Sequence, residues 1–314
     1  MCTGFKIKLK YNLLIFYIYT DLFNNYDTLL MHTVLTLIQL TTEYFEKKNI
    51  ESPRLNAELL LAHVLSCKRL QLYLMFDKPV QEGELTQYRE LIKKRGERMP
   101  LQYITGEVEF YGLSFCCEPA ALIPRPETEL LVEKCIEIMK PAGSAKILDI
   151  GCGSGNIAIS LAYNLPDAAI DALDISGDAI ELASRNESRI LPASRINFIN
   201  CDINSFDDSV SNVYDMIVSN PPYVSKEDYS GLQEEILSFE PNIAVTDFGD
   251  GYSFYKLISK KSQSLLKQGG YLVFEMAQGQ TVKISDMMTE NGFGNIEVFK
   301  DLQNIDRIIK GTKL

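Results

Sequence analysis

The segment SNPPY, residues 219–223, places an asparagine and two consecutive prolines directly after the apolar run YDMIV. Proline lacks a backbone N–H and pushes the residue before it toward extended geometry. Asn220 and Pro221 are therefore predicted to be extended at the end of a buried strand, with backbone carbonyls and one side-chain amide on offer to a ligand. A plain Asn-Pro-Pro turn is the alternative interpretation.

A second segment whose residue types could bind a ligand is the glycine loop DIGCGSGN, residues 149–156. Gly151, Gly153 and Gly155 permit close approach of a ligand to the backbone and unusual φ values. In open α/β sheets such strand-to-helix loops are where ligands bind. The dinucleotide fingerprint would require glycine at 156, where Asn156 stands, so the spacing disfavours pyrophosphate binding. A plain tight turn is the alternative.

Two acidic residues end the next two predicted strands. Asp174 follows AIDAL, 23 positions after Gly151, and Asp202 follows INFINC. A carboxylate at the first place accepts hydrogen bonds from both hydroxyls of a ribose, and one at the second place could accept from an adenine amine. Either residue alone is more often a helix cap or a turn former. Their succession after a glycine loop predicts a nucleoside site.

This set of motifs resembles the class I S-adenosylmethionine-dependent methyltransferases. The resemblance implies S-adenosylmethionine as methyl donor and places Asp149 toward its methionyl amino group, directly or through water. The cofactor-binding residues that it implies are Asp149, Gly151, Cys152, Gly153, Ser154, Gly155, Asp174, Asp202, Ile203 and Asn220.

The NPPY segment is known from methyltransferases that act on planar nitrogens, namely adenine N6, cytosine N4 and glutamine side-chain amides. Such a nitrogen delocalises its lone pair and is a poor nucleophile. The Asn220 side-chain oxygen and the Pro221 carbonyl could each accept one substrate N–H, which fixes the nitrogen and favours lone-pair density toward the methyl group. Pro222 would stiffen the wall, and Tyr223 would stack on the planar group. Asn220, Pro221 and Tyr223 are therefore the candidate catalytic residues.

Further segments resemble the release-factor glutamine methyltransferases of the HemK/PrmC type. They are PLQYITGEVEFYGL, LIPRPETELLVE, LDIGCGSGNIAISLA and DMIVSNPPYVS, and the resemblance runs from about residue 31 to the end. It implies methylation at N5 of the glutamine in the GGQ loop of peptide-chain release factors. Glu127 and Glu129 would lie near the pocket, but the favoured interpretation is that they are acids placed at a helix N-terminus by the helix dipole.

The chain departs from this family's usual pattern at three places. Thr246, Asp247 and Phe248 stand in a stretch that usually carries small residues and glycine. Ala277 and Asn304 each stand where glycine is common. None of them lies on the NPPY segment, so activity is expected to persist.

The pattern of elements must bring these segments together. Apolar strands alternate with helices from about residue 145, which predicts a doubly wound α/β sheet. The resemblance implies the seven-stranded class I methyltransferase sheet, with the strand before NPPY beside the strand before the glycine loop. Two final strands without a helix between them suggest an antiparallel edge hairpin. The predicted segments are a helical substrate-recognition domain (31–99), a β-hairpin linker (100–129) and the methyltransferase domain (130–314).

Composition narrows the class of partner. The net charge is −11, and residues 111–314 carry 17 basic and 29 acidic side chains, so a duplex nucleic acid is not the expected partner. The basic run KKRGER (93–98) is a solvated helix end or a docking surface. Seven cysteines and two histidines without metal-ligand spacing predict reduced thiols, no metal site and a cytoplasmic protein.

The first thirty residues carry an apolar run too short to span a bilayer, and no small-residue cleavage site follows. We therefore expect residues 1–30 to be an extension outside the family pattern, with a natural start at Met31. We also expect the protein to be a monomer that does not bind membranes. An adenine-N6 nucleic-acid methyltransferase is the alternative enzyme, but it needs a base-flipping surface. The alternative that is not an enzyme is a protein that binds the cofactor without catalysis. The presence of both Asn220 and the glycine loop disfavours it.

Overall fold

A computed structural model of the chain describes residues 32–206 and 211–314. The prediction for residues 1–30 lies outside the described residues. The chain divides into two compact units, with the boundary between Glu97 and Arg98. Within the described ranges, no helix is both long and apolar enough to cross a membrane.

The first unit is helical. Its helices are α2 (Val34–Lys47), α3 (Pro53–Val64), α4 (Arg69–Leu72) and α5 (Glu82–Gly96). The Thr33 side chain caps α2 by accepting from the backbone N–H of Thr36, and Pro53 opens α3 where its missing N–H costs nothing. In the run KKRGER, Lys93 and Lys94 are exposed, but Arg95 is buried and donates to Asn56. The prediction of a solvated helix end thus holds for the two lysines and is wrong for Arg95.

The second unit begins with the short helix α6 (Leu101–Thr105) and a two-stranded hairpin. The strands β1 (Glu107–Phe110) and β2 (Leu113–Cys116) pair antiparallel. Tyr111 and Gly112 both have positive φ, 50° and 74°, as a two-residue turn that matches the strand twist requires. The hairpin predicted within 100–129 is therefore present and occupies its central part.

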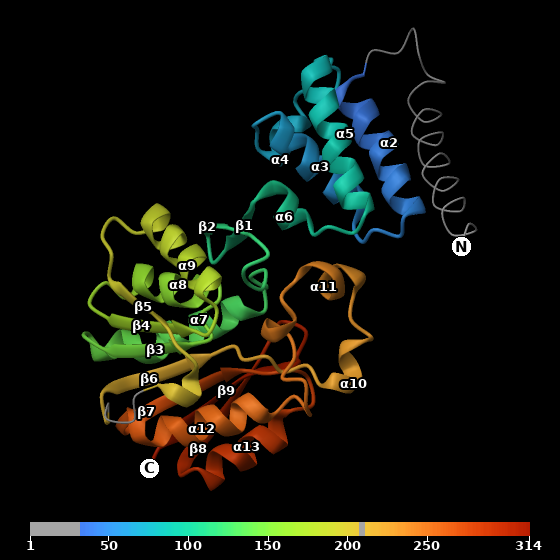
Figure 1. Ribbon diagram of the computed structural model, residues 1–314. Coiled ribbons are helices and arrows are strands. Elements are labelled where there is room, and N and C mark those ends of the chain that lie inside the picture. Colours follow the sequence, from blue (N-terminus) through green and yellow to red (C-terminus); the bar gives the residue numbers. More distant parts are fainter. Residues whose placement is uncertain (1–31, 207–210) are drawn as a thin grey trace. The chain divides into compact units, whose positions relative to one another are not determined.

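A seven-stranded sheet forms the rest of the second unit (Figure 1). Its strand order is β5-β4-β3-β6-β7-β9-β8, and all neighbours are parallel except those of β9. The strands are β3 (Lys146–Ile150), β4 (Ala169–Asp174), β5 (Ile196–Asn200), β6 (Tyr214–Ser219), β7 (Leu266–Glu275), β8 (Phe293–Lys300) and β9 (Asp306–Lys313). The predicted edge hairpin and the adjacency of the strands before the glycine loop and before NPPY are both confirmed.

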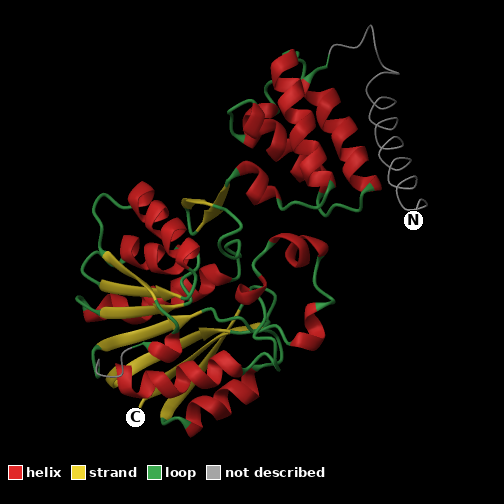
Figure 2. Cartoon of the chain, viewed as in Figure 1, coloured by secondary structure: helices red, strands yellow, loops and turns green. Residues whose placement is uncertain are grey.

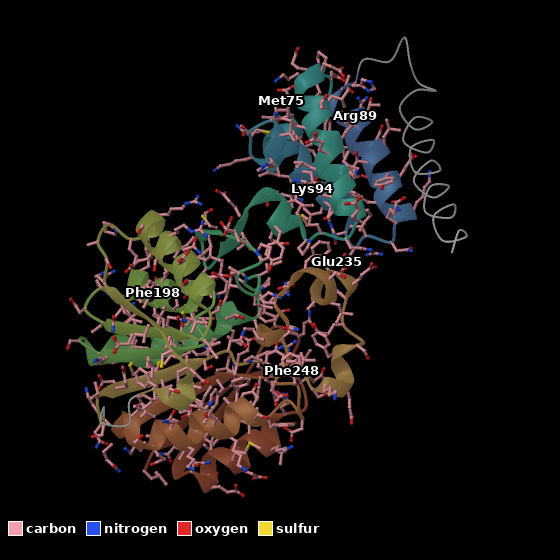
Figure 3. The ribbon with its side chains drawn as sticks, viewed as in Figure 1. Met75, Arg89, Lys94, Phe198, Glu235 and Phe248 are labelled. Atoms are coloured by element: carbon pink, nitrogen blue, oxygen red, sulfur yellow. The ribbon has the colours of Figure 1, made fainter. Side chains whose placement is uncertain are left out.

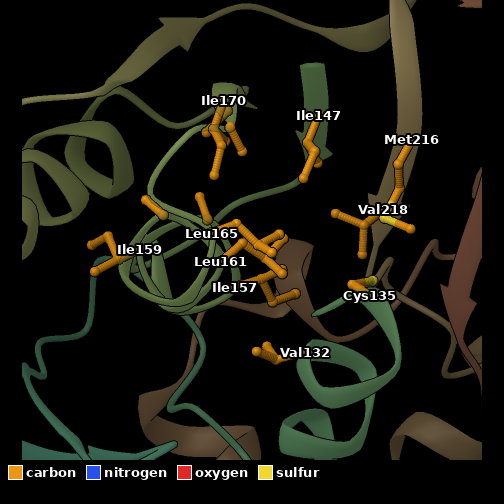
Figure 4. Packing of buried hydrophobic residues seen from close by; sticks show 14 of the residues in the cluster. Val132, Cys135, Ile147, Ile157, Ile159, Leu161, Leu165, Ile170, Met216 and Val218 are labelled. Carbon is orange, nitrogen blue, oxygen red and sulfur yellow. The ribbon is translucent and has the colours of Figure 1, made fainter. Parts of the chain in front are cut away.

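Helices cover both faces of this sheet (Figure 2). They are α7 (Thr128–Met139), α8 (Asn156–Asn164) and α9 (Gly177–Ile190) on one face, and α12 (Ser253–Leu265) and α13 (Thr281–Glu290) on the other. Successive strand residues alternate between the two cores. Ile147 packs with α7 and α8 (Figure 4). Leu148 belongs to the cluster that contains residues of α12. Burial on both faces explains the continuous apolar strands.

The connection between β6 and α12 carries the remaining small elements. They are α10 (Lys226–Tyr229), α11 (Glu234–Phe239) and a three-residue 3-10 turn at Asn242–Ala244. Two further 3-10 turns lie outside this connection, at Ile203–Ser205 after β5 and at Lys140–Ala142 after α7. This connection returns to the sheet beside the NPPY segment, because Val224 forms a β-bridge with Thr246. It therefore supplies a wall opposite the strand ends.

Candidate functional site

A cavity of about 520 Å³ opens where β3, β4, β5 and β6 end. Its volume lies within the range of small-molecule sites. The structure brings ten of the sequence-predicted residues onto its wall: Gly151, Cys152, Gly153, Ser154, Asp174, Asp202, Ile203, Asn220, Pro221 and Pro222. Asp149, Gly155 and Tyr223 are not on the wall. The parallel topology causes this convergence, because the carboxyl ends of neighbouring parallel strands meet at one edge.

The glycine loop leaves its backbone open toward the cavity. Gly151 has φ 76°, and a side chain built there would meet nothing within 4 Å. Gly155 serves another purpose. It caps α8 with φ 80°, and a Cβ atom would lie 2.9 Å from Ile159 Cδ1 and 3.0 Å from Ala183 Cβ. Glycine is thus required at 155 for helix packing, and a ligand contact, as predicted for it, is not what the geometry indicates.

Asp174 ends β4 and orients the glycine loop. Its Oδ2 accepts from the Gly153 N–H at 2.9 Å, and its Oδ1 accepts from the Ser176 N–H at 2.9 Å. Burial raises the pKa of Asp174, and these backbone donors oppose the shift. Each oxygen keeps a second lone pair, so the carboxylate is rigidly placed and still able to accept from a diol.

Asp202 and Ile203 follow β5. The Asp202 carboxylate caps the short turn after it by accepting from the Asn204 N–H at 2.8 Å. The alternative reading as a cap is therefore correct, and the same residue also lines the cavity. Ile203 is 5% exposed and packs into the core under the sheet, so it fixes this wall as an apolar surface.

Asp149 is fully buried behind the glycine loop. Its Oδ2 accepts from the Ala158 N–H at 3.2 Å, while Oδ1 has no hydrogen-bond partner. Burial raises the pKa of Asp149 from 3.8 to about 7. Because Asp149 is absent from the cavity wall, its predicted interaction with an amino group requires a bridging water rather than direct contact.

Asn220 and Pro221 are held at the junction of two strands. The hydroxyl of Ser219 donates to the Ile150 carbonyl at 2.7 Å, which ties the end of β6 to the end of β3. The Asn220 amide nitrogen donates to Thr128 Oγ1 at 3.2 Å. The side-chain nitrogen is thus engaged with α7, and the oxygen is the atom left to accept from a ligand.

Tyr223 is the last residue of the NPPY segment. Its ring packs with residues of α12 and β7, and burial raises its pKa. Its carbonyl accepts from the Gln280 side chain at 3.2 Å. Tyr223 is partly buried and does not line the cavity, so its stacking on a planar substrate stays a prediction.

Sequence reasoning missed the wall formed by residues 119–125. Glu240, which is 7% exposed, holds this segment by accepting from the Ile123 N–H at 3.1 Å and from Arg125 Nη2 at 2.5 Å. Thr128 also lines the cavity, whereas Glu127 does not, and Glu129 accepts from the Tyr111 N–H. The two prolines of the segment PRPETE are the sequence feature that could have predicted this wall.

The family departures lie partly on the same cavity. Thr246, Asp247 and Phe248 all line it, and Phe248 is 55% exposed (Figure 3). Phe248 has φ 56°, a conformation that favours glycine. Asn304 has φ 64°, which asparagine tolerates better than most residues. The aromatic ring of Phe248 therefore lines the cavity, in a stretch where the family usually carries small residues.

These residues fit S-adenosylmethionine. An open glycine backbone, a placed carboxylate for a ribose and an apolar wall suit the nucleoside, and the buried unpartnered Oδ1 of Asp149 suits a cationic tail through water. Among the residues that the structure describes, no group of three or more acidic, cysteine or histidine side chains could hold a metal ion.

Comparisons with known proteins agree with this site. Residues 36–106 match the PrmC N-terminal domain, and residues 142–310 match a methyltransferase domain. The catalytic domain of hMettl16 in complex with the MAT2A 3'UTR hairpin 6 has a TM-score of 0.54 at 15% identity, covers 72% of this chain and is itself covered to 82%. That likeness shows the shared class I fold.

Curated relatives cover most of the chain. Release factor glutamine methyltransferase of Chlorobaculum tepidum is 40% identical over 282 residues, which are 88% of this chain and 95% of the relative. That of Fusobacterium nucleatum is 39% identical over 281 residues, 89% of this chain and 78% of the relative. With its methyltransferase domain, the chain belongs to the release factor glutamine methyltransferases and uses S-adenosylmethionine as methyl donor.

Proposed function

We propose that the protein transfers a methyl group from S-adenosylmethionine to N5 of the glutamine in the GGQ motif of peptide-chain release factors. The observation that carries the proposal is the joint position of Asn220 and Gly151 on one cavity wall, at the ends of paired strands. A nitrogen acceptor site and a cofactor loop are thereby within one small cavity. The relatives' name supplies the substrate class.

When bound, the cofactor supplies an electrophilic methyl group on a sulfonium. The residues of the chain orient the nucleophile: Asn220 Oδ1 and the Pro221 carbonyl each accept one N–H of the glutamine amide. As the nitrogen forms its bond to the methyl carbon, the sulfur–carbon bond breaks and the nitrogen becomes cationic. The two acceptor oxygens stabilise that charge, and the nitrogen then loses one proton to water.

We further propose that the helical unit recognises the release factor, and that the enzyme acts as a cytoplasmic monomer without direct nucleic-acid binding. Support for the last point is the charge of residues 111–314, which carry 17 basic and 29 acidic side chains. Neutralising a phosphate backbone needs a basic surface.

The test uses labelled S-adenosylmethionine with a purified release factor, beside the same factor with GGQ changed to GGA. We expect label on the first protein alone, and fragmentation mass spectrometry should place one methyl group on the glutamine side chain. Equal labelling of both proteins, or labelling of an adenine-containing oligonucleotide in preference to the factor, would refute the proposal.

A further inference from the structure

Behind Asn220 lies a buried acidic side chain that the proposed reaction does not use. Glu275 is the last residue of β7, is 2% exposed and does not line the cavity. It closes the apolar run YLVFE. Burying a carboxyl group costs free energy unless nearby groups donate hydrogen bonds to it or carry an opposite charge.

The register of the sheet explains which partners it meets. In the parallel pair β6 and β7, Ser219 is opposite Phe274, so the next residues, Asn220 after β6 and Glu275 at the end of β7, are neighbours at the same edge of the sheet. Thr128, the first residue of α7, is 2% exposed and completes the group. Three side chains from three separate elements thus meet in one buried place.

The polar atoms of Asn220, Thr128 and Glu275 set the direction of the Asn220 amide. The Asn220 amide nitrogen donates to Thr128 Oγ1 at 3.2 Å. The Glu275 carboxyl lies close enough to the Thr128 hydroxyl and the Asn220 amide for both groups to lower its pKa. The second carboxyl oxygen, Oε2, is buried without a partner. The bond to Thr128 therefore sets the direction of the Asn220 nitrogen and leaves Oδ1 as the atom that can accept from a ligand.

This arrangement decides what Asn220 presents to a substrate. An ionised carboxyl only accepts, so a rotated Asn220 amide would set its oxygen against a carboxyl oxygen. The negative charge behind the nitrogen also polarises the amide and strengthens Oδ1 as an acceptor. A substrate nitrogen that carries two N–H groups needs an acceptor at this point.

We infer that Glu275, together with Thr128, is a positioning residue that holds the Asn220 amide with Oδ1 toward the cavity for methyl transfer. The inference rests on the proposed function, since it is there that Asn220 Oδ1 meets the substrate. Glu275 itself touches neither substrate nor cofactor.

Burial is the main reason why Glu275 titrates in the neutral range, and the groups around it modify the shift. Burial raises its pKa to about 7; Glu127 beside α7 adds to the shift, while Arg307 on β9 opposes it, as do Thr128 and Asn220. Protonation below that pH removes the charge that anchors the amide. Activity should therefore rise as pH increases through about 7.

The kinetic test compares Glu275→Gln and Thr128→Val with Glu290→Gln, a control at the exposed end of α13. A glutamine side chain offers a donor as well as an acceptor, so the Asn220 amide loses its preferred direction. We expect Glu275→Gln to lower kcat at least about tenfold, with the KM for S-adenosylmethionine within about twofold and the acidic limb of the pH profile lost. Thr128→Val should lower kcat less, and the control should match the wild type.

An independent readout needs no activity. The side-chain amide signals of Asn220 in a ¹⁵N spectrum, assigned by their loss in Asn220→Ala, should shift with an apparent pKa near 7 in the wild type. They should not titrate in Glu275→Gln. Amide signals that ignore pH, or a Glu275→Gln enzyme with unchanged kcat and pH profile, would overturn the inference.

The two proposals fail separately. A wild-type enzyme that methylates a release factor while Glu275→Gln behaves identically refutes the positioning role alone. A wild-type enzyme that leaves release factors unmodified, but whose Asn220 signals titrate through Glu275, refutes the proposed substrate and retains the contact.

Discussion

Asp149 should make the folded protein less stable as pH rises, the reverse of the usual behaviour of a carboxyl group. Burial raises its pKa from 3.8 to about 7, and its Oδ1 has no hydrogen-bond partner. Between these two values the folded state binds one proton that the unfolded state has released. Stability therefore falls with rising pH across this window, by about 1.4 kcal/mol per pH unit.

The variant Asp149→Asn keeps the shape and removes the titration. The full effect spans roughly three pH units, or on the order of 4 kcal/mol, and is complete above the folded-state pKa of about 7. Between about pH 5 and about pH 8 the variant should gain about 3 kcal/mol relative to the wild type. Glu275 titrates in both proteins, so its contribution cancels in the comparison.

The assay should report on the second unit alone, because the chain has two compact units and multi-domain chains commonly depart from two-state unfolding. Hydrogen exchange of a peptide that covers β3, measured against urea concentration at both pH values, isolates that unit. Asp167→Asn, at an exposed turn after α8, is the matched control and should follow the wild type. An Asp149→Asn protein whose stability depends on pH just as the wild type's does would refute the argument.

Three substitutions test the remaining roles. Asn220→Ala should lower kcat at least about a hundredfold while calorimetry finds cofactor affinity within about threefold, because it removes an acceptor used during methyl transfer; an unchanged rate contradicts this. Asp174→Asn should weaken cofactor binding at least about tenfold, since it sets an amide N–H₂ against a backbone donor or a ribose hydroxyl, and equal affinity by calorimetry argues against the ribose role. Gly155→Ala should lower the free energy of unfolding by about 1–3 kcal/mol in urea titrations, because its Cβ would lie 2.9 Å from Ile159; full stability would show that the packing is looser.

Much of the site was predictable because it depends on local patterns. Glycine at 151 and 153, acids after two strands and prolines after a third each carry a physical requirement that is visible in the residue types. The period of the apolar runs likewise predicts the doubly wound sheet and the edge hairpin. These features hold regardless of how distant segments pack.

Other roles depended on contacts between distant segments. Gly155 and Tyr223 belong to motifs, yet the first packs against α9 and the second is partly buried against the core that includes residues of α12. Glu240 stabilises a wall more than a hundred positions earlier in the chain, through Arg125. A motif specifies residue type and spacing, but burial is set by what packs against it.

The sequence by itself determined which chemistry is present: a glycine loop, strand-end carboxylates and an NPPY turn, in an order that predicts a methyltransferase sheet. Only the tertiary structure decided which atoms of those residues face the cavity. The side-chain direction of Asn220 depends on Thr128 and Glu275, which lie 92 and 55 positions away and meet it only because α7 and β7 pack at the end of β6. Hydrogen-bond direction is a property of that packing, so no spacing within one segment encodes it.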